Sequence, residues 1–482
     1  MKNNYNNSES SLKNFLEIPY DKLEEMNLKA KEKRDSVDPK DQEVEYRKYL
    51  ESEKRIKAIT LCFSDIEGKL HMLDYDKKFL LASAANLTFD GSSIRGFTVQ
   101  SESDLRLDID WTSFMWLPAD LFGPGKVIMF ANILNRDRSL YESDLRGQLQ
   151  DFTRQLKREE KIEAYVSAEI EGFLMDGVNA EQNYEEEDFK LISTGGYFHS
   201  LPLDKLRQFI DACAEAQRAM GYKNEKDHPE VAPSQFELNF SYTQALRACD
   251  QIQLYKLVCR QVATSMGMTA TFLPKPVIGI NGSGMHTNFS LFKGGKNLFY
   301  DKKGKDSLSA LGWDYVSKLL NHAPELSLIF SSSVNAYRRL DPHFEAPNQI
   351  KASAIDRGAM VRLPVGNDKT TRLEIRAVAP DANPYLVIFA ILKIGLNGKR
   401  LPVNSNRRER LRFLPGNIND AIRLFRSSTF TGKILGEENK EKYLSFKSAV
   451  ADRSPRELGK SIKVSEVIYH HEVTNQVLWN SF

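Results

Sequence analysis

The sequence predicts an α+β protein in which a small, mostly β domain precedes a larger domain of strands and helices. Strand-like runs dominate residues 45–140, and beyond Ser139 strand patterns alternate with long helical patterns. The length of 482 residues is sufficient for two or three domains at about 150 residues each. Strands mixed with helices that pack on them define the α+β class.

Composition excludes several classes of protein. The chain has 67 Lys+Arg and 65 Asp+Glu, a formal charge of +2, which argues against a nucleic-acid binder. It contains no run of about 18 apolar residues, so we expect no membrane span. The opening MKNNYNNSES lacks the apolar stretch of a secretory signal, and the four cysteines lack disulfide or zinc spacing. We therefore expect a soluble, cytoplasmic protein.

The first domain is expected at residues 43–140. Residues 1–42 are polar and rich in Asn, Lys and Glu, so we expect a flexible or helical extension before it. A helix at 43–54, a strand at 56–63 and a further strand at 127–132 follow from the apolar pattern.

The larger domain is expected at residues 141–482. A helix at 203–220 would bury Leu203, Leu206, Ile210, Cys213 and Ala214 on one face and end at Gly221. A second helix is expected at 244–268, with Ile252, Tyr255, Val258 and Val262 buried, and Cys249 and Cys259 as buried thiols. Strands are expected at 163–174, 233–240, 285–292 and 371–378.

An acidic pair stands on the first of these strands. Glu169 and Glu171 are two residues apart, so both carboxylates point to the same face. A solvated strand face would explain the pair alone, but the apolar residues around it indicate a buried strand. Two buried like charges are costly unless a positive group lies between them.

Further segments supply Glu230, Glu237, His286 and Glu374. Gly282 and Gly284 precede His286 and permit close approach of the backbone to a ligand, although a lone histidine is more often structural. Together the five carboxylates and one imidazole form an oxygen-rich set that suits Mg²⁺ or Mn²⁺.

Arginines lie near these acids. Arg372 and Arg376 flank Glu374 on one strand face, and Arg339, Arg357 and Arg362 stand beside apolar residues. A surface ion-pair ladder is the alternative for the strand. Arginine grips carboxylate and phosphate in a planar, bidentate way, so acids interleaved with arginines favour phosphoryl transfer to an anionic acceptor. Neither a Walker A loop nor a kinase signature occurs.

With these segments in view, residues 45–440 closely resemble the glutamine synthetase family of the bacterial and archaeal class I type. The resemblance is carried by long motifs in order: FDGSSIRGF, SESDL, AEIEGF, GGYF, DQIQLYK, TATFLPKP, NGSGMH, NAYRRLDPHFEAP, RLPVGND, RLEIRAVAPDANPYL and ILKIGLNGK. It implies a β-grasp N-terminal domain followed by the α+β catalytic domain, and a homo-oligomeric dodecamer of two six-membered rings with shared active sites.

The resemblance also implies residue roles. The tighter cation would be bound by Glu171, Glu230 and Glu237, and the cation nearer ATP by Glu169, His286 and Glu374. Glutamate and the transferred phosphate would be bound by Asn281, Gly282, Arg339, Arg362 and Arg376. The nucleotide would be bound by Glu225, Tyr242, Asn288, Ser290, Arg357, Lys369 and Arg372. Arg339 and Arg357 would also be catalytic. Ammonium would lie near Asp90, Ser93, Asp104 and Tyr197, with Asp90 as the base and Glu345 as the residue that closes the site.

The implied reaction is ATP-dependent ligation of ammonia to L-glutamate through γ-glutamyl phosphate, as part of nitrogen assimilation. Two alternatives are a ligase that joins glutamate to a larger amine such as a polyamine, and a non-catalytic homologue. The presence of Asp90, Asp104, Tyr197 and Glu345 favours ammonia. Two positions depart from the family pattern: Arg95 lies in the loop after Asp90, and Pro229 replaces a histidine that often precedes the metal glutamate.

Overall fold

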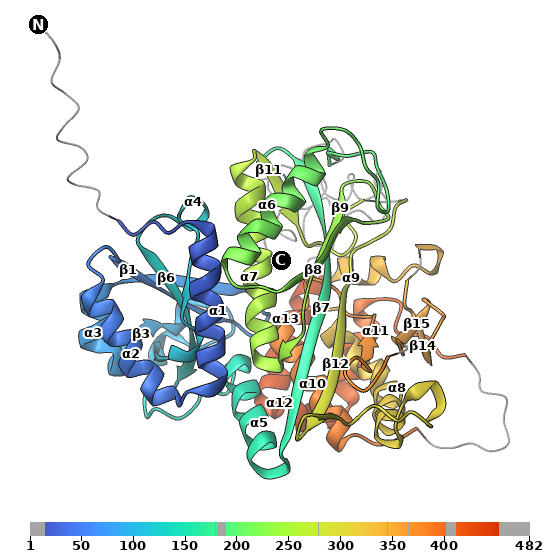
Figure 1. Cartoon of the computed structure of the whole chain (residues 1–482). Coiled ribbons are helices and arrows are strands. Elements are labelled where there is room, and N and C mark those ends of the chain that lie inside the picture. Colours follow the sequence, from blue (N-terminus) through green and yellow to red (C-terminus); the bar gives the residue numbers. More distant parts are fainter. Residues whose placement is uncertain are drawn as a thin grey trace, which may run out of the picture. The chain divides into compact units, whose positions relative to one another are not determined.

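The computed structural model describes residues 15–178, 180, 189–277, 279–344, 346–364, 366–401 and 411–452 (Figure 1). The chain divides into two compact units. Unit 1 consists of residues 1–65, 70–147 and 212–223, and unit 2 consists of residues 66–69, 148–211 and 224–482. Both units combine helices with a mixed sheet, which confirms the α+β class.

Unit 1 is built on a six-stranded sheet with the order β2-β1-β6-β4-β3, and β5 pairs with β6. Only β1 and β6 run parallel. The expected strands at 56–63 and 127–132 are confirmed as β1 and β6. The strands are β1 Ala58–Ser64, β2 Leu70–Asp76, β3 Leu87–Asp90, β4 Asp104–Ile109, β5 Met115–Trp116 and β6 Lys126–Leu134.

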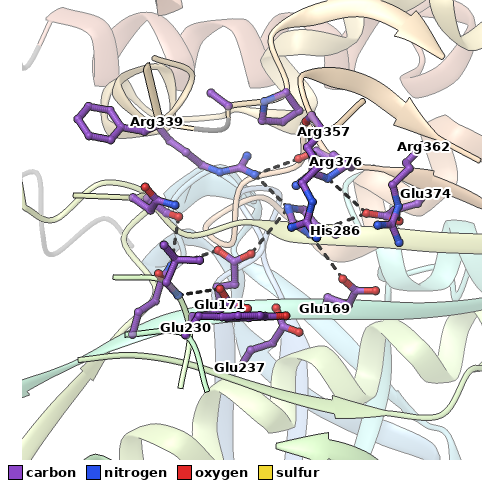
Figure 2. Close-up of a pocket in the computed structure, with 18 of the residues that line it drawn as sticks. Glu169, Glu171, Glu230, Glu237, His286, Arg339, Arg357, Arg362, Glu374 and Arg376 are labelled. Atoms are coloured by element: carbon purple, nitrogen blue, oxygen red, sulfur yellow. Dashed lines mark hydrogen bonds and ion pairs between the residues drawn. The ribbon is translucent and has the colours of Figure 1, made fainter. Parts of the chain in front are cut away.

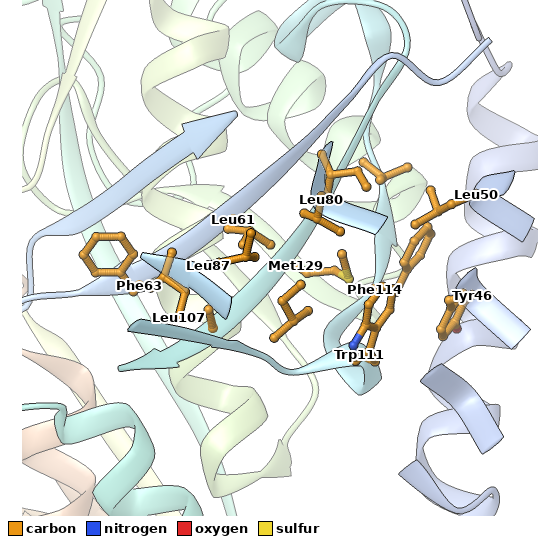
Figure 3. Packing of buried hydrophobic residues seen from close by; sticks show 14 of the residues in the cluster. Tyr46, Leu50, Leu61, Phe63, Leu80, Leu87, Leu107, Trp111, Phe114 and Met129 are labelled. Atoms are coloured by element: carbon orange, nitrogen blue, oxygen red, sulfur yellow. The ribbon is translucent and has the colours of Figure 1, made fainter. Parts of the chain in front are cut away.

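The helix expected at 43–54 is confirmed as α2, Pro39–Ser52. It begins earlier than expected because the Asp38 side chain accepts a hydrogen bond from the Lys40 backbone N–H and Pro39 occupies the first turn. Figure 3 shows Tyr46 and Leu50 of this helix in the unit 1 core. The Tyr46 ring stacks on Phe114 with a centroid distance of 4.3 Å.

Part of the segment expected as a polar extension is the helix α1, Tyr20–Ser36. Its buried residues are Leu23, Asn27 and Ala30, which lie on one helix face, and Leu23 belongs to the unit 1 core. The Asn27 amide donates to the Trp116 carbonyl oxygen and accepts from the Trp116 N–H, both at 3.0 Å. One buried stripe in an otherwise polar segment is sufficient to order the helix.

Unit 2 contains a ten-stranded sheet with the order β14-β15-β16-β12-β7-β9-β8. Strands β10 and β11 pair with β7, and β13 pairs with β12. The strands are β7 Ile162–Asp176, β8 Asn224–Pro229, β9 Gln235–Phe240, β10 Thr243–Gln244, β11 Met268–Thr271, β12 Met285–Lys293, β13 Lys296–Asn297, β14 Gln349–Ser353, β15 Ala359–Arg362 and β16 Leu373–Ile375. The four strands expected for this domain correspond to β7, β9, β12 and the short β16.

The long helix expected at 244–268 is confirmed as α7, and Ile252, Tyr255, Val258 and Val262 are buried in it. It packs against β7 and β11, and α10 packs against both α7 and α8. The remaining helices are α3 Lys77–Ser83, α4 Ala119–Phe122, α5 Leu145–Glu160, α6 Lys205–Ala219, α7 Ala245–Ser265, α8 Ala310–Phe330, α9 Val334–Arg339, α10 Pro384–Asn397, α11 Ile418–Ser427, α12 Thr429–Leu435 and α13 Glu437–Asp452.

The prediction that Leu203 belongs to the buried face of a helix is wrong. Helix α6 begins at Lys205, because the Asp204 carboxylate accepts from the Leu206 backbone N–H at its start. Leu203 stays in the preceding loop with φ of 55° and 90% exposure. The other four residues assigned to this face are buried as predicted: Leu206, Ile210, Cys213 and Ala214.

All four cysteines are buried and none forms a disulfide, and the buried thiols expected at Cys249 and Cys259 are confirmed. Within the described residues, no helix combines the length and the apolar character that a bilayer span requires.

A buried ion pair in unit 1 generates a stability prediction. The Arg146 side chain is 0% exposed and donates to Asp110 at 2.8 Å and to the Asn132 side-chain oxygen at 2.7 Å. Replacing Asp110 with Ala would remove the carboxylate that pairs with the buried guanidinium, so we expect a loss of about 3–5 kcal/mol. The double variant Asp110→Ala, Arg146→Met should recover part of that loss in thermal unfolding.

A matched exposed pair serves as the control. Arg423 and Asp420 form an ion pair of 2.9 Å in which the side chains are 75% and 44% exposed. Asp420→Ala should lower the free energy of unfolding by less than about 1 kcal/mol, measured in the same thermal unfolding experiment. Equal losses for Asp110→Ala and Asp420→Ala would contradict the assigned importance of the buried pair.

Candidate active site

The register of unit 2 brings the predicted acids together. His286 of β12 lies opposite Glu169 of β7, and Glu171 of β7 lies opposite Glu237 of β9. Directly opposed residues in an antiparallel pair have their Cβ atoms about 5 Å apart. Figure 2 shows the side chains of Glu169, Glu171, Glu237 and His286 gathered over neighbouring strands.

The first group of metal-compatible ligands is Glu169, His286 and Glu374, whose ligand atoms all lie within 4.8 Å of one another. The His286 Nδ1 atom is 3.6 Å from Glu169 Oε2 and 4.0 Å from Glu374 Oε1. The structure therefore places together the three residues that the resemblance grouped around one cation.

The second group is His228, Glu230 and Glu237, again within 4.8 Å. The resemblance grouped Glu171 with the two glutamates, whereas His228 completes the close trio in the structure. Glu171 lies nearby: its Oε1 atom is 3.8 Å from His286 Nε2, and its Oε2 atom accepts from Gly284 N at 2.9 Å.

The acids are electrostatically frustrated. Burial, together with the charge of Glu171, raises the pKa of Glu230 to about 7. Burial and Glu171 also raise the pKa of Glu237 well above its ordinary value. Burial opposes ionisation of Glu169 as well, but His286 and Asn288 lower its pKa to about 2. A divalent cation would relieve the repulsion among the carboxylates of Glu171, Glu230 and Glu237 when they are ionised.

Arginines enclose the same pocket. Arg362 donates from Nε to Glu374 Oε2 at 2.6 Å, and Arg376 Nε lies 3.4 Å from Glu374 Oε1. Arg339 is buried and donates to the backbone carbonyls of Val378 and Arg376 at 3.3 and 3.0 Å. Burial lowers the pKa of Arg339 to about 10, so its charge persists at neutral pH.

Glycines permit the close approach of these side chains. A Cβ atom on Gly282 would lie 2.5 Å from the Pro274 carbonyl oxygen and 3.0 Å from Arg339 Cγ. A Cβ atom on Gly284 would lie 2.5 Å from Arg339 Nη2 and 2.7 Å from His286 Nε2. Any larger side chain at either position would displace Arg339.

A second pocket adjoins the first, with Glu169, Lys226 and Arg372 lining both. It contains six of the seven residues that the resemblance assigned to the nucleotide: Glu225, Tyr242, Asn288, Ser290, Lys369 and Arg372. The seventh, Arg357, lines the first pocket with Asn281, Gly282 and Tyr197. Tyr165, Phe240 and Phe289 add apolar surface to the second pocket.

Asp90, Ser93 and Asp104 lie in unit 1. Asp90 of β3 pairs with Asp104 of β4, and its carboxylate accepts from the Ser92 and Ser93 hydroxyls at 2.6 Å each. These hydrogen bonds lower the pKa of Asp90, so the carboxylate is ionised and available as a proton acceptor at neutral pH. Arg95 is exposed in the loop that follows.

The loop that carries Tyr197 is held by His199. The His199 Nδ1 atom contacts the Gly196 carbonyl oxygen at 2.7 Å, and Nε2 lies 2.5 Å from Asp204 Oδ2. Ser193 Oγ also donates to this carboxylate oxygen, at 3.0 Å. A Cβ atom on Gly195 would lie 2.2 Å from the His199 ring, so the ring packs directly on the backbone.

Glu345 lies outside the described residues, although its neighbours Phe344 and Ala346 line the first pocket. Sequence reasoning missed His228, Lys226, Gln235 and His199. The alternation of strand residues could have indicated His228, because it stands two positions before Glu230. Gln235, which donates to Glu171 Oε2 at 3.2 Å, carries no such signal in the sequence.

Comparison with known proteins agrees with this geometry. Residues 142–459 match the glutamine synthetase catalytic domain, and residues 55–136 match the glutamine synthetase beta-Grasp domain. The chain belongs to the glutamine synthetase family. Family members in general depend on ATP and divalent cations, and the match confirms the β-grasp assignment of the N-terminal domain.

Two bacterial relatives cover most of the chain. It is 35% identical to the glutamine synthetase of Thermus thermophilus over 405 residues, which are 79% of this chain and 89% of the relative. It is 36% identical to the glutamine synthetase of Thermotoga maritima over 419 residues, 83% of this chain and 94% of the relative.

Solved structures share the fold. The cryo-EM structure of Plasmodium falciparum glutamine synthetase has a TM-score of 0.77 and 21% identity, and the match covers 87% of this chain and 98% of that one. An ADP complex of a protein named GmaS has a TM-score of 0.73 and 24% identity, and the match covers 87% and 99%.

The raised pKa of Glu230 predicts a pH-dependent stability in metal-free protein. Between its ordinary pKa of 4.5 and about 7 the native state binds more protons than the unfolded state, so stability falls as pH rises. Glu230→Gln keeps the neutral shape. In EDTA we expect the parent and Glu230→Gln to unfold at equal thermal midpoints at pH 5. At pH 8 we expect the free energy of unfolding of the variant to be higher than that of the parent by up to about 3 kcal/mol. A stability difference between Glu230→Gln and the parent that does not change with pH would contradict the raised pKa of Glu230.

The His199 contacts predict a local effect. His199→Ala should accelerate amide hydrogen exchange of the backbone at 194–199, because the bonds to Gly196 and Asp204 are lost. His199→Gln should restore part of the protection, and exchange within α7 should stay unchanged. Equal exchange of the loop in the parent and in His199→Ala would show that other contacts hold Tyr197.

Proposed function

We propose that the protein is a glutamate–ammonia ligase, which couples ATP hydrolysis to the formation of L-glutamine from L-glutamate and ammonium. The reaction would pass through γ-glutamyl phosphate, with ADP and phosphate as the other products. The observation that carries this proposal is one pocket in which two trios of metal-compatible ligands lie beside five arginines, and which adjoins a second pocket.

The donor atoms fit two hard divalent cations. Carboxylate oxygens and imidazole nitrogens suit Mg²⁺ or Mn²⁺, and the buried, mutually repelling carboxylates described above favour a cation over their ionised, empty state. The two trios, with Glu171 between them, would hold these ions. When bound, they would neutralise phosphate charge as the phosphoryl group is transferred.

The arginines would position the acceptor. Glu374 holds Arg362 and Arg376 from one side, so their remaining N–H groups are oriented without a loss of side-chain entropy at the moment of binding. Arg339 is fixed by backbone carbonyls in the same way. Such preorganised donors bind the glutamate carboxylate and stabilise charge that spreads over the transferred phosphoryl group. Asn281 and Gly282 would contact the amino-acid end of glutamate.

Asp90, which would approach from the neighbouring subunit, would convert ammonium to ammonia, which has the lone pair needed to attack the acyl phosphate. Its carboxylate is ionised and exposed, as a proton acceptor must be. Ser93, Asp104 and Tyr197 would complete the ammonium pocket. Glu345 would exclude water, which otherwise hydrolyses the intermediate.

The proposed assembly is a homo-oligomer, namely a dodecamer of two six-membered rings with active sites shared between subunits. The proposed location is the cytoplasm. Both rest on the family to which the chain belongs.

A product assay tests the function. Purified protein with ATP, Mg²⁺ or Mn²⁺, L-glutamate and ammonium should release phosphate and form glutamine in equal amounts, measured by mass spectrometry. A parallel screen should include methylamine and polyamines. Phosphate release only with a bulky amine would replace ammonia by that amine, and no release with any amine would favour a non-catalytic homologue.

The base assignment has a matched control. Asp137 is also exposed, and it accepts from Ser139 N at 2.9 Å and Ser139 Oγ at 2.6 Å, as Asp90 accepts from Ser92. Asp90→Ala should lower kcat with ammonium about 10²–10⁴-fold and preserve ATP binding. Asp137→Ala should leave turnover unchanged. Equal turnover in the Asp90 variant and the parent would refute the role of Asp90 as base.

A further inference from the structure

We propose that Asp381 is a positioning residue for Arg339, which it holds in place through Ser333 at the start of α9. The inference deepens the proposed function, in which Arg339 would bind glutamate and the transferred phosphate, and it rests on that function for the role of Arg339. Neither Asp381 nor Ser333 lines the two pockets described above.

Asp381 directs a carboxylate into the interior of unit 2. The residue as a whole is half-buried, whereas its Oδ1 atom is fully buried and has no hydrogen-bond partner among the described residues. Burial raises the pKa of Asp381, and the hydrogen bond from Ser333 and the charges of Lys447 and Lys256 act in the opposite direction. A buried carboxylate is costly without a donor, so the bond that Ser333 donates is held firmly.

The Ser333 hydroxyl joins this carboxylate to a helix. Its Oγ atom donates to Asp381 Oδ2 at 2.5 Å and accepts from Ala336 N at 3.1 Å, and the second bond is the N-cap of α9. A hydroxyl has a single proton. Because that proton is directed at Asp381, the oxygen lone pairs face the helix N–H. Asp381 therefore fixes the orientation in which Ser333 caps α9.

Helix α9 depends on this cap more than a long helix would. It contains six residues, so most of its N–H groups have no partner inside the helix. Asn335 anchors α9 a second time, because its side chain accepts from Lys275 N at 2.6 Å and donates to the Lys275 carbonyl oxygen at 2.9 Å. Loss of the Ser333 cap would therefore shift α9 rather than unfold it. The shift would reach Arg339, which lies at the other end of the helix, about 9 Å away.

The chain segment that carries Asp381 also holds the other end of α9. The backbone carbonyls of Arg376 and Val378 accept from the Arg339 guanidinium at 3.0 and 3.3 Å. Asp381 follows Val378 by three residues and accepts from the cap residue. One segment therefore fixes both the first turn of the helix and the side chain at its last position. The competing explanation is that Asp381 only stabilises the fold, in which case its loss would affect every substrate alike.

Steady-state kinetics of the purified full chain with ATP, Mg²⁺, L-glutamate and ammonium test the inference. Asp381→Ala should lower kcat/KM for L-glutamate about 10–10²-fold, because Arg339 is displaced, and should change KM for ATP by less than about twofold. Asp381→Asn retains an oxygen that accepts from Ser333, so it should recover most of the loss. Equal losses toward L-glutamate and ATP, or no recovery in Asp381→Asn, would overturn the proposal.

The cap residue has a matched control in Ser309, the N-cap of α8. Ser309 Oγ accepts from Gly312 N at 3.1 Å and donates to the Leu298 carbonyl oxygen at 2.6 Å. Ser333→Ala and Ser309→Ala each remove a capping hydroxyl, but only Ser333→Ala should lower kcat/KM for L-glutamate, by about tenfold. Ser333→Thr retains the hydroxyl and should match the parent. If Asp381→Ala fails to fold, this comparison decides, and equal kcat/KM in the two alanine variants would overturn the proposal.

Amide hydrogen exchange gives a readout that does not need turnover. Exchange of the backbone at 334–339 should be faster in Ser333→Ala than in the parent and in Ser309→Ala, and equal exchange in the three proteins would overturn the proposal. An active parent whose Ser333 and Asp381 variants match it would refute the positioning role and retain the ligase. An inactive parent in which Ser333→Ala loosens α9 would retain the support of Arg339 and refute the ligase.

Discussion

The concentration of buried carboxylates on one face of the unit 2 sheet is the constraint on which the site depends. Glu171, Glu230 and Glu237 come from neighbouring strands and are too close to ionise together without compensation. A fold selected for stability alone would place apolar residues there, because burial of an unpaired charge costs several kcal/mol. The sheet instead keeps an excess of negative charge that a divalent cation would neutralise.

The positively charged arginine side chains of the site do not neutralise this excess negative charge. Arg362 and Arg376 are both engaged by Glu374, and Arg339 is anchored to backbone carbonyls. Arg362 and Arg376 are therefore fixed beside the first trio, while the charge of Arg357 acts on Glu230 in the second. Burial opposes ionisation of Glu169, but its contact with His286 outweighs burial and lowers its pKa, whereas burial and the charge of Glu171 raise the pKa of Glu230. The same pocket thus contains Glu169, which is ionised at neutral pH, and Glu230, whose ionisation a bound cation would favour.

Much of the site follows from the sequence because strands have a strict period. Glu169 and Glu171 share a face by alternation, and long apolar runs predicted the strands and α7. Two kinds of information were absent. Register between strands far apart in sequence decides that His286 of β12 meets Glu169 of β7, and no local pattern encodes it. Capping decides that α6 begins after Asp204, which leaves Leu203 exposed. The average composition of residues 1–42 is polar, so it gave no sign that Leu23, Asn27 and Ala30 form a buried face of α1.

The distribution of residues between the two units separates the chemical tasks. Cation ligands, arginines and the residues assigned to the nucleotide all belong to unit 2, whereas Asp90, Ser93 and Asp104 belong to unit 1. In the proposed function, activation of glutamate would need side chains of unit 2 alone, most of them on its sheet and Arg339 on α9. Choice of the amine would depend instead on Asp90 and Asp104 of unit 1 and on loops such as the one in which His199 holds Tyr197. Substitutions in such loops leave the buried carboxylates unchanged, so a change of amine substrate is compatible with an intact phosphoryl-transfer site.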